Sequence, residues 1–469
     1  MKFHILIYGC QMNYADSARI STILKNIGWK QTNQIDDADI VIFDTCSVRQ
    51  KSEDKITWKL TQIPKDKKIW ITGCMVQHNL SKKKLEEMSE LEKKWQIKLK
   101  KWNFIWNLSD IKVEEIPFII NEVYSPLWQT LSKKFKNLEL MFRIDDVHLL
   151  PKIVKHLGYE VDPKEIEKIQ NYVDLLPSVA NQTENENIKT AYVPISTGCN
   201  QFCSYCIVPF ARGLEQYRSI EDIVNEVKYW TDKWKEEIVL LGQIVNKHPK
   251  FYEILVEVLK NPKVKWLRYT SPYPTYYNDK IFELHEKEER LCPHIHIPVQ
   301  SGSNKVLKLM NRGYTVEQFK EFIDKIRNLK RDISITTDII VGFTDETEED
   351  FAQTVDLVKY ARFDMIYTWI YSPRPNTKAY KALKDNIPYS EKHKRWEVLN
   401  NLLYDISLEN NKKEIGKTRP TMIVWKKEWK FYGYTDNFKN IELDNFDETK
   451  IWEIVDVKIK DAISLKLFG

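Results

Sequence analysis

The feature that most constrains this chain is a group of three cysteines, Cys199-x3-Cys203-x2-Cys206, here called the loop triad, within residues 196–208. A structural zinc ion takes four ligands, so three thiolates alone leave one position empty. Three thiolates can instead bind three irons of a [4Fe–4S] cluster and leave the fourth iron open to a small molecule. Two alternatives remain, a zinc knuckle that lacks one ligand and cysteines that are only buried structural residues.

The composition is that of a globular protein. The chain has 469 residues, of which 42 % are hydrophobic and 30 % charged, and its formal net charge is +5. This length suits about three domains, and the mild positive charge fits a nucleic-acid partner without requiring one. No apolar run approaches the roughly 20 residues that cross a bilayer, and the N-terminus does not resemble a signal peptide. We therefore expect a cytoplasmic protein with reduced cysteines and no membrane partner.

Three more cysteines, here called the N-terminal triad, each end an apolar, strand-like run. Cys10 ends FHILIYGC, Cys46 ends DIVIFDTC and Cys74 ends KIWITGC. Helical or polar segments, including 16–27 and 52–61, separate these runs, and this alternation predicts a parallel α/β sheet. Ligands gather at the carboxyl ends of strands in such a sheet, so the three thiols could converge on one site. The alternative is that these cysteines merely cap strands.

The motifs around both triads resemble those of the methylthiotransferase family of radical S-adenosylmethionine (SAM) enzymes. The matching pieces are YGCQMNYADS, DTCSVR, TGCM, GCNQFCSYCIVPFARG, EIVLLGQ, CPHIHIPVQSGS, LMNRGYT, TTDIIVGF and YSPRPNT. The resemblance implies two [4Fe–4S] clusters as metal sites. The cluster on the loop triad would bind and cleave SAM, and the cluster on the N-terminal triad would carry or donate sulfur. The seventh cysteine, Cys292, is interpreted as a core thiol.

Six strand-like runs alternate with helical stretches between about Thr190 and Tyr380. They are YVPIS, EIVLLG, VKWLRY, HIHIPV, ISITTDIIVGF and MIYTWIYS. Capping-box patterns begin three of the helices, at Ser219, Thr315 and Thr347. The alternation predicts a parallel barrel or a doubly wound sheet. The resemblance implies a partial TIM-type (β/α)6 radical SAM barrel.

Chemistry in parallel barrels lies at the carboxyl ends of the strands, and the loop triad follows the first strand as that rule requires. Polar residues at the other strand ends are candidate SAM contacts, and the ring of Tyr205 could lie against the adenine. The candidate cofactor-binding residues are Tyr205, Gln243, Gln300 and Asp338, with Gly242 and Ser301 beside them. Each strand-end residue could instead be an ordinary turn residue. The chain departs from the family at Ile244, Thr344 and Asp345, where Asn, Pro and Gly are usual.

After residue 413 the pattern changes to five short β runs, TMIVW, KFYGYT, NIEL, IVDVKI and SLKLF. Strands at this spacing predict a small all-β barrel. The segment resembles the TRAM domain, an RNA-binding barrel of tRNA-modifying enzymes. Lysines beside aromatic rings suit RNA contacts, and the candidates are Lys426, Lys427, Lys430, Lys439, Phe431, Tyr432 and Tyr434. The alternative is an ordinary barrel with exposed lysines.

These patterns predict three domains. An N-terminal methylthiotransferase α/β domain covers 1–165, a radical SAM partial barrel covers 186–412, and a TRAM-like β-barrel covers 414–469. A lysine-rich insert over about 80–140 interrupts the first domain. Its charged stretch, 80–101, is expected to be a solvated helical face rather than an RNA contact.

The resemblance implies a tRNA methylthiotransferase that acts at C2 of N6-isopentenyladenosine next to the anticodon. A radical from SAM would abstract the hydrogen and a second SAM would supply the methyl group, so no catalytic acid–base residue is expected. The implied partners are the tRNA anticodon stem-loop, an electron donor and a sulfur source, and a monomer is expected. The alternatives are N6-threonylcarbamoyladenosine of tRNA, an aspartate of a ribosomal protein and, in a different class, a non-catalytic metal-cluster RNA-binding protein.

Tryptophan is unusually common, because the chain has 15 Trp and only 13 Gly, the reverse of average usage. Glycine is usual in the family at Trp234, Trp429 and Trp452, and Trp70 is a further candidate. Glycine tolerates positive φ angles that tryptophan does not. We interpret the pattern as a gene in which UGA encodes glycine, translated here as tryptophan. The alternative is a genuinely Trp-rich protein.

Overall fold

The structure is a computed structural model that describes residues 1–46, 56–76, 126–161, 188–444 and 446–469. It forms two compact units. Unit 1 comprises Met1–Glu186, Thr197–Gln201 and Cys206–Arg218, and unit 2 comprises Asn187–Ser196, Phe202–Tyr205 and Ser219–Gly469. The three predicted domain boundaries stay a prediction. Most of the lysine-rich insert, its charged stretch and part of the predicted helix over 52–61 lie outside the described residues.

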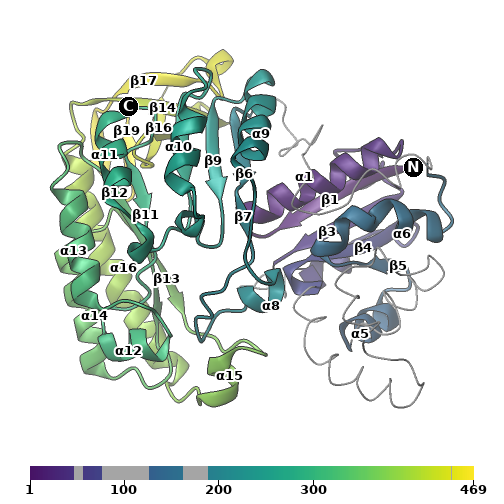
Figure 1. Cartoon of the computed structure of the whole chain (residues 1–469), viewed down its shortest axis with the longest axis horizontal. Helices are drawn as coiled ribbons and strands as arrows, with labels where there is room; N and C mark the ends of the chain where they lie inside the picture. Colours follow the sequence, from purple (N-terminus) through teal and green to yellow (C-terminus); the bar gives the residue numbers. More distant parts are fainter. Residues whose placement is uncertain (47–55, 77–125, 162–187, 445) are drawn as a thin grey trace. The chain divides into compact units, whose positions relative to one another are not determined.

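Unit 1 is built on a fully parallel sheet with the strand order β2-β1-β3-β4-β5 (Figure 1). The central strand β3 is buried along its whole length, as expected for a parallel sheet covered on both faces. The predicted N-terminal parallel α/β sheet is therefore confirmed. The elements are β1 (Lys2–Tyr8), α1 (Gln11–Asn26), β2 (Lys30–Gln31), β3 (Ile40–Thr45), β4 (Lys68–Gly73), α5 (Pro126–Lys134), β5 (Leu138–Met141), α6 (Leu150–His156) and α8 (Val208–Arg212).

Helix α1 begins at Gln11, not at the predicted residue 16. Its N-cap is Cys10, and the backbone N–H of Cys10 donates to Asn13 Oδ1 at 3.1 Å. This bond is one half of a capping box. Cysteine is not among the residues preferred at N-caps, so the sequence pattern did not reveal this start.

Unit 2 contains all six strands predicted for the central region. They form two parallel sheets, β6-β9-β10 and β11-β12-β13, and a parallel bridge between Leu267 and Leu291 joins them. The strands follow one another in chain order, which confirms a partial (β/α)6 barrel. The strands are β6 (Thr190–Pro194), β9 (Glu237–Leu241), β10 (Trp266–Tyr269), β11 (His294–His296), β12 (Ser334–Val341) and β13 (Met365–Ile370), with the two-residue strands β7 (Ser196–Thr197) and β8 (Gln216–Tyr217) nearby in sequence.

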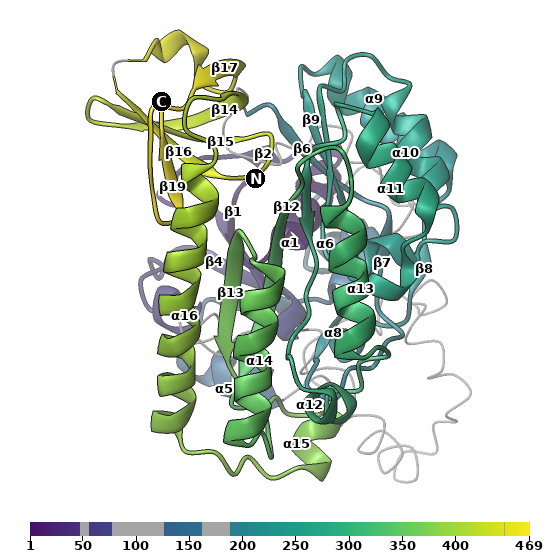
Figure 2. The same ribbon diagram turned by 90° about the vertical axis from the view of Figure 1, so that its left-hand side faces the viewer.

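Helices cover the outside of this partial barrel (Figures 1 and 2). Those beside β6, β9 and β10 are α9 (Ile220–Asp232), α10 (Phe251–Leu259) and α11 (Asp279–Lys287). Those beside β12 and β13 are α13 (Val316–Arg327), α14 (Glu348–Ala361) and α16 (Tyr389–Lys412), and the short helices α12 (Asn304–Leu309) and α15 (Lys378–Ala382) follow β11 and β13. The three predicted capping residues are confirmed, because the side chains of Ser219, Thr315 and Thr347 each accept a backbone N–H three residues later.

The C-terminal residues form a mainly antiparallel sheet with the order β17-β14-β15-β16-β19-β18. The five predicted runs correspond to β14 (Thr418–Lys427), β15 (Lys430–Thr435), β16 (Asn440–Asp444), β17 (Ile454–Lys458) and β19 (Lys466–Phe468). The short strand β18 (Asp461–Ile463) was not predicted.

The C-terminal sheet packs against the amino-terminal ends of the barrel strands. Trp266 at the start of β10, Cys292 just before β11 and Met422 of β14 share one buried cluster. Arg268 of β10 pairs with Glu237 at 2.7 Å and donates to the backbone oxygen of Thr435 in β15 at 3.2 Å. Cys292 is therefore a core residue, as expected.

The tryptophans at glycine-like positions differ from one another. Trp234 and Trp452 have φ angles of +64° and +73°, and Trp234 is 80 % exposed. Such angles are outliers for a bulky residue and agree with the glycine interpretation. Trp70 does not, because it lies within β4, is fully buried and donates its indole N–H to Glu139 Oε2 at 2.9 Å. Trp429 has no positive φ in the β14–β15 turn, although its neighbour Glu428 does.

Candidate functional site

The N-terminal triad lies at one edge of the parallel sheet of unit 1. Cys10 follows β1 after one intervening glycine, and Cys46 and Cys74 directly follow β3 and β4. These strands are neighbours, with Tyr8 opposite Thr45 in the register and Thr45 opposite Gly73. The carboxyl ends of three adjacent strands therefore bring the three cysteine-bearing turns together, as the sequence predicted.

Two glycines permit the close approach of these turns. A Cβ on Gly9 would lie 3.1 Å from the Cβ of Cys46 and would collide with the side chain of Asn13. Gly73 has a φ of +91°, and a Cβ there would lie 2.3 Å from the backbone oxygen of Thr45. A side chain at either position would push the turns apart.

Two of the three cysteines of the N-terminal triad are buried, and charged side chains lie close to them. Burial raises the pKa of the Cys74 thiol, the cation of Arg212 lowers it, and the neighbouring Cys46 and Cys10 raise it further. Cys46 and Cys74 are buried, whereas Cys10 is exposed. Deprotonation of the Cys74 thiol therefore needs a compensating positive charge, which a bound metal cluster would supply.

A buried polar network lies beneath the triad. Asp44 of β3 accepts hydrogen bonds from Asn13 Nδ2 at 2.7 Å and from Ser17 Oγ at 2.8 Å. Burial and then the neighbouring Asp16 raise the pKa of Asp44 to about 8. Asp16 in turn forms an ion pair of 2.6 Å with Arg212 at the end of α8. Helix α1 and the segment after the loop triad are thus joined within unit 1.

The two flanks of the loop triad are fixed within unit 1. The backbone N–H of Cys199 donates to the oxygen of Gly213 at 3.1 Å. Gly198 has a φ of +75°, and a Cβ there would lie 2.0 Å from the backbone oxygen of Leu214. The loop can therefore close on itself only with glycine just before its first cysteine.

The middle of the loop is fixed within unit 2. The backbone N–H of Ser204 donates to the oxygen of Met310 at 2.9 Å, and its own oxygen accepts from the N–H of Ala379 at 2.7 Å. Cys203 Sγ accepts a hydrogen bond from Arg312 Nη1 at 3.5 Å. Sequence reasoning assigned no role to Arg312, although it lies in the LMNRGYT piece.

Tyr205 and Gln243 are two of the candidate SAM contacts. The ring of Tyr205 packs edge-on against Phe343 with centroids 6.4 Å apart. Gln243 follows β9, and its Oε1 atom is buried without a hydrogen-bond partner among the described residues. A buried acceptor left open in this way is what a ligand N–H would satisfy.

The two candidates from β11 and β12 are placed differently from each other. Gln300 adopts a φ of +73° and pairs with β12 through its backbone. Asp338 lies in the middle of β12 rather than at its end, so the strand-end argument was wrong for this residue. Its carboxylate accepts from Trp369 Nε1 at 2.9 Å and contacts His296 Nε2 at 3.1 Å. Sequence analysis did not single out either partner.

Ser301, named beside Gln300, is fully buried against α14. Its hydroxyl lies 3.4 Å from that of Thr354 and accepts the N–H of Ser303 at 3.2 Å. A Cβ on the next residue, Gly302, would lie 2.4 Å from the Cα of Thr354. This turn therefore holds α14 against the barrel.

The donor set fits iron–sulfur clusters, because thiolates are the ligands that such clusters take. Among the described residues, however, no group of three His, Cys, Asp or Glu side chains lies close enough to form a complete metal site. The ligand role of the six cysteines stays a prediction, supported by the positions of the turns that carry them.

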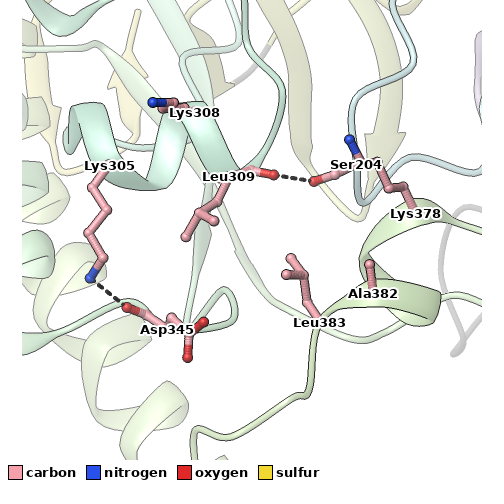
Figure 3. Close-up of a pocket in the computed structure, with 8 residues that line it drawn as sticks. All are labelled: Ser204, Lys305, Lys308, Leu309, Asp345, Lys378, Ala382 and Leu383. Atoms are coloured by element: carbon pink, nitrogen blue, oxygen red, sulfur yellow. Dashed lines mark hydrogen bonds between the residues drawn. The ribbon is translucent and has the colours of Figure 1, made fainter.

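A pocket of about 570 Å³ lies beside Ser204 in unit 2 (Figure 3). Leu309 of α12 and Leu383 after α15 point into it, and Lys305 at its side donates to the backbone oxygen of Asp345 at 2.8 Å. The pocket thus combines an apolar interior with a basic rim. Its lining residues are Ser204, Lys305, Lys308, Leu309, Asp345, Lys378, Ala382 and Leu383.

The candidate RNA contacts of the C-terminal sheet are only partly available. Lys439 is buried and pairs with Asp364 at 2.6 Å. Phe431 is buried in the sheet's core, and Tyr434 OH donates to Glu237 Oε2 at 2.6 Å. Lys439 and Tyr434 join the sheet to the barrel and Phe431 is buried within the sheet, so the assignment of these three residues as RNA contacts was wrong.

The remaining candidates lie on the β14–β15 hairpin. Lys427 is exposed, whereas Lys426 and Lys430 pair with Glu448 and Glu442. Tyr432 stacks on Trp425, with ring centroids 4.1 Å apart. Sequence reasoning missed Trp425, which is 49 % exposed.

No helix in the described part of the chain is both long and apolar enough to cross a membrane.

Two family models match the chain. Residues 193–358 match the Radical SAM superfamily, and residues 2–94 match a family described as Uncharacterized protein family UPF0004. Two similar relatives are both described as tRNA-2-methylthio-N(6)-dimethylallyladenosine synthase. The protein of Thermoanaerobacter sp. (strain X514) is 34 % identical and the alignment covers 100 % of this chain and 92 % of the relative. The protein of Bacillus subtilis (strain 168) is 34 % identical over 100 % of this chain and 85 % of the relative.

A solved structure is similar in fold. It is the radical S-adenosylmethionine methyltransferase TsrM from Kitasatospora setae, with a TM-score of 0.53 and 11 % sequence identity, and the match covers 91 % of this chain and 79 % of that chain.

Proposed function

Because this chain belongs to the family of tRNA-2-methylthio-N6-dimethylallyladenosine synthases within the radical SAM superfamily, we propose that it inserts a methylthio group at C2 of N6-isopentenyladenosine, next to the tRNA anticodon. The observation that carries the proposal is the presence of two cysteine triads on turns after parallel strands, in a chain that aligns with these relatives over its full length.

The cofactors are SAM and [4Fe–4S] clusters, which when bound supply the one-electron cleavage of SAM and the sulfur and methyl groups. The loop triad would hold the cluster that binds SAM. The N-terminal triad would hold the second cluster, above the buried Asp44 network. Gln243 offers its open Oε1 to an N–H group of SAM. The chain therefore needs residues that bind and orient rather than a catalytic acid–base pair.

The anticodon stem-loop would contact unit 2 at the pocket beside Ser204. Ser204, which lines this pocket, stands between Cys203 and Cys206 of the loop triad in the sequence. Lysines suit phosphate groups and an apolar floor suits a base. Lys308 and Lys378 are exposed and form no ion pair with a carboxylate among the described residues. We assign this pocket to one nucleotide of the RNA.

The other proposed partners follow from the reaction. A low-potential one-electron donor must reduce the cluster that cleaves SAM, and a sulfur source must replace the sulfur that leaves with the product. A monomer is sufficient for this scheme, since one chain carries both triads.

The test is the product itself. Protein reconstituted anaerobically with iron and sulfide receives SAM, a chemical reductant and tRNA bearing isopentenyladenosine, and the tRNA is then digested and its nucleosides weighed. We expect the methylthio-isopentenyladenosine nucleoside. If SAM is cleaved and only tRNA bearing threonylcarbamoyladenosine gains the methylthio group, the substrate assignment is wrong.

Cysteine variants separate the two triads. Cys203→Ala should abolish formation of 5′-deoxyadenosine, because the SAM-binding cluster loses a ligand. Cys46→Ala should leave SAM cleavage largely intact but stop sulfur insertion. Cys292→Ala is the matched control, because it removes a core thiol that belongs to neither triad. Loss of SAM cleavage in a well-folded Cys46→Ala protein would contradict this division of roles.

A further inference from the structure

Arg312 presents a fixed positive charge to one cysteine of the loop triad. It lies in the turn between α12 and α13, and its Nη1 donates to Cys203 Sγ at 3.5 Å. Its Nη2 donates to the backbone oxygen of Pro298 at 2.9 Å, and its Nε donates to Tyr314 OH at 3.1 Å. Because a guanidinium group stays protonated in proteins, this charge does not depend on pH.

Aromatic rings and backbone contacts hold the guanidinium in place. Its central carbon lies 4.5 Å from the ring centroid of Tyr273 and 5.2 Å from that of Tyr314. The preceding residue, Asn311, has a φ of +57° and donates its Nδ2 to the backbone oxygen of Phe202 at 3.0 Å. Two neighbouring residues of this turn therefore contact two neighbouring residues of the loop: Asn311 bonds to Phe202 and Arg312 bonds to Cys203. All of these residues belong to unit 2.

A positive charge and a hydrogen bond at a ligand sulfur favour the more negative state of an iron–sulfur cluster. The effect is large in surroundings from which water is excluded. Reduction adds one electron to the cluster from a low-potential one-electron donor, and no bond or proton needs to move with it. Arg312 therefore acts on the step that precedes SAM cleavage.

We propose that Arg312 is a positioning residue that raises the reduction potential of the SAM-binding cluster through its hydrogen bond to Cys203 Sγ. This rests on the proposed role of Cys203 as a cluster ligand. Arg312 touches neither SAM nor RNA in this scheme, so its effect should be seen without either.

The experiment is a redox titration followed by electron paramagnetic resonance, on anaerobically reconstituted full-length protein. The parent carries alanine at the three positions of the N-terminal triad, so that only one cluster contributes to the signal. In Arg312→Gln, the ratio of reduced to oxidised cluster at a fixed potential should fall about tenfold, which is a shift of about 59 mV to lower potential for a one-electron couple. No tRNA is needed.

Arg327→Gln is the matched control. Arg327 is the last residue of α13. It also donates to backbone oxygens, those of Ile333 at 3.0 Å and Ala361 at 3.3 Å. This variant removes the same charge from a structural arginine, so its cluster should keep the parent's potential.

Arg312→Lys distinguishes charge from hydrogen-bond geometry. A potential between those of the parent and Arg312→Gln supports the proposal. An unchanged potential in Arg312→Gln overturns it. If Arg312→Gln binds no iron, the potential of Arg312→Lys is compared with that of the parent: a lower potential supports the proposal and an unchanged potential overturns it. If both variants lose iron, the proposal is overturned, because Arg312 then holds the cluster in place instead of setting its potential. The two experiments fail independently. An unchanged potential in Arg312→Gln would not alter the methylthio product, and a missing methylthio product would not alter the shift in reduction potential.

Discussion

Replacing Arg212 by methionine is expected to loosen helix α1 and the segment that follows the loop triad. The Arg212 Nη2 atom lies 2.6 Å from Asp16 Oδ2, and the two side chains are 2 % and 0 % exposed. Asp16 lies on α1, which follows Cys10, and Arg212 ends α8, which follows Cys206. This ion pair therefore joins the polypeptide after one triad to the polypeptide after the other, within unit 1.

The magnitude follows from burial. Arg212→Met leaves the Asp16 carboxylate in the interior without this cation and near Asp44, whose pKa is raised to about 8 by burial and by Asp16. Removing one member of a buried ion pair costs roughly 3–5 kcal/mol. Since 1.4 kcal/mol corresponds to a factor of about ten, local opening of α1 should become more than about a hundredfold more frequent.

Native-state hydrogen exchange of peptides from α1 measures this directly. Arg212→Met should raise their exchange rates by that factor, and Asp16→Asn combined with Arg212→Met should restore most of the protection. Lys260→Met is the control, because its pair with Glu257 is exposed and such pairs contribute less than about 1 kcal/mol. If the double variant loses as much protection as the two single variants together, the residues are not coupled and the reasoning is refuted.

Three further predictions concern RNA binding, backbone strain and pH. The double variant Lys308→Ala, Lys378→Ala should weaken binding of the anticodon stem-loop. It should also reduce the slope of log binding constant against log salt concentration by about 1 for each lysine. An unchanged slope, measured by fluorescence anisotropy, would rule out the pocket as the RNA contact. Trp234→Gly should stabilise the protein by about 0.5–1 kcal/mol in urea denaturation, because glycine adopts a φ of +64° without strain. The control is Trp58→Gly, within helical residues 56–60, which should destabilise the protein by about 1 kcal/mol. A loss of stability in Trp234→Gly would end the glycine interpretation. Burial lowers the pKa of His285 to about 3, so the unfolded chain binds a proton below its ordinary pKa of about 6.5 that the folded chain does not. The contribution of His285 to stability should therefore fall as the pH drops below about 6.5, with a slope that approaches about 1.4 kcal/mol per pH unit. The difference in unfolding free energy between the parent and His285→Gln should show this slope, and a difference that does not change with pH would contradict the assignment.

The strands and their ends could be predicted because their signals are local. Each of the six barrel strands coincides with an apolar run, and the rule that ligands meet at carboxyl strand ends brought Cys10, Cys46 and Cys74 to one edge of the sheet. Helix caps were equally predictable where the cap is Ser or Thr. The start of α1 was missed because its cap is a cysteine.

The contacts that were missed join residues far apart in the sequence. Arg312 meets Cys203 across 109 residues, and Tyr434 meets Glu237 across 197. No spacing pattern reports such pairs, because they depend on how the barrel closes and on which side chains the C-terminal sheet buries. Asp338 was interpreted as a strand-end residue although the predicted run ISITTDIIVGF continues past it. Its pairing with Tyr367 of β13 shows that it lies mid-strand.

The most direct test of the central claim follows the hydrogen at C2 of the target adenosine. Transfer RNA carrying isopentenyladenosine with deuterium at C2 is incubated with reconstituted protein, SAM and reductant, and the 5′-deoxyadenosine that forms is weighed. The account predicts deuterium in 5′-deoxyadenosine together with a methylthio nucleoside that has lost its deuterium. Cleavage of SAM with no deuterium transfer, and with the C2 label retained in the tRNA, would contradict it.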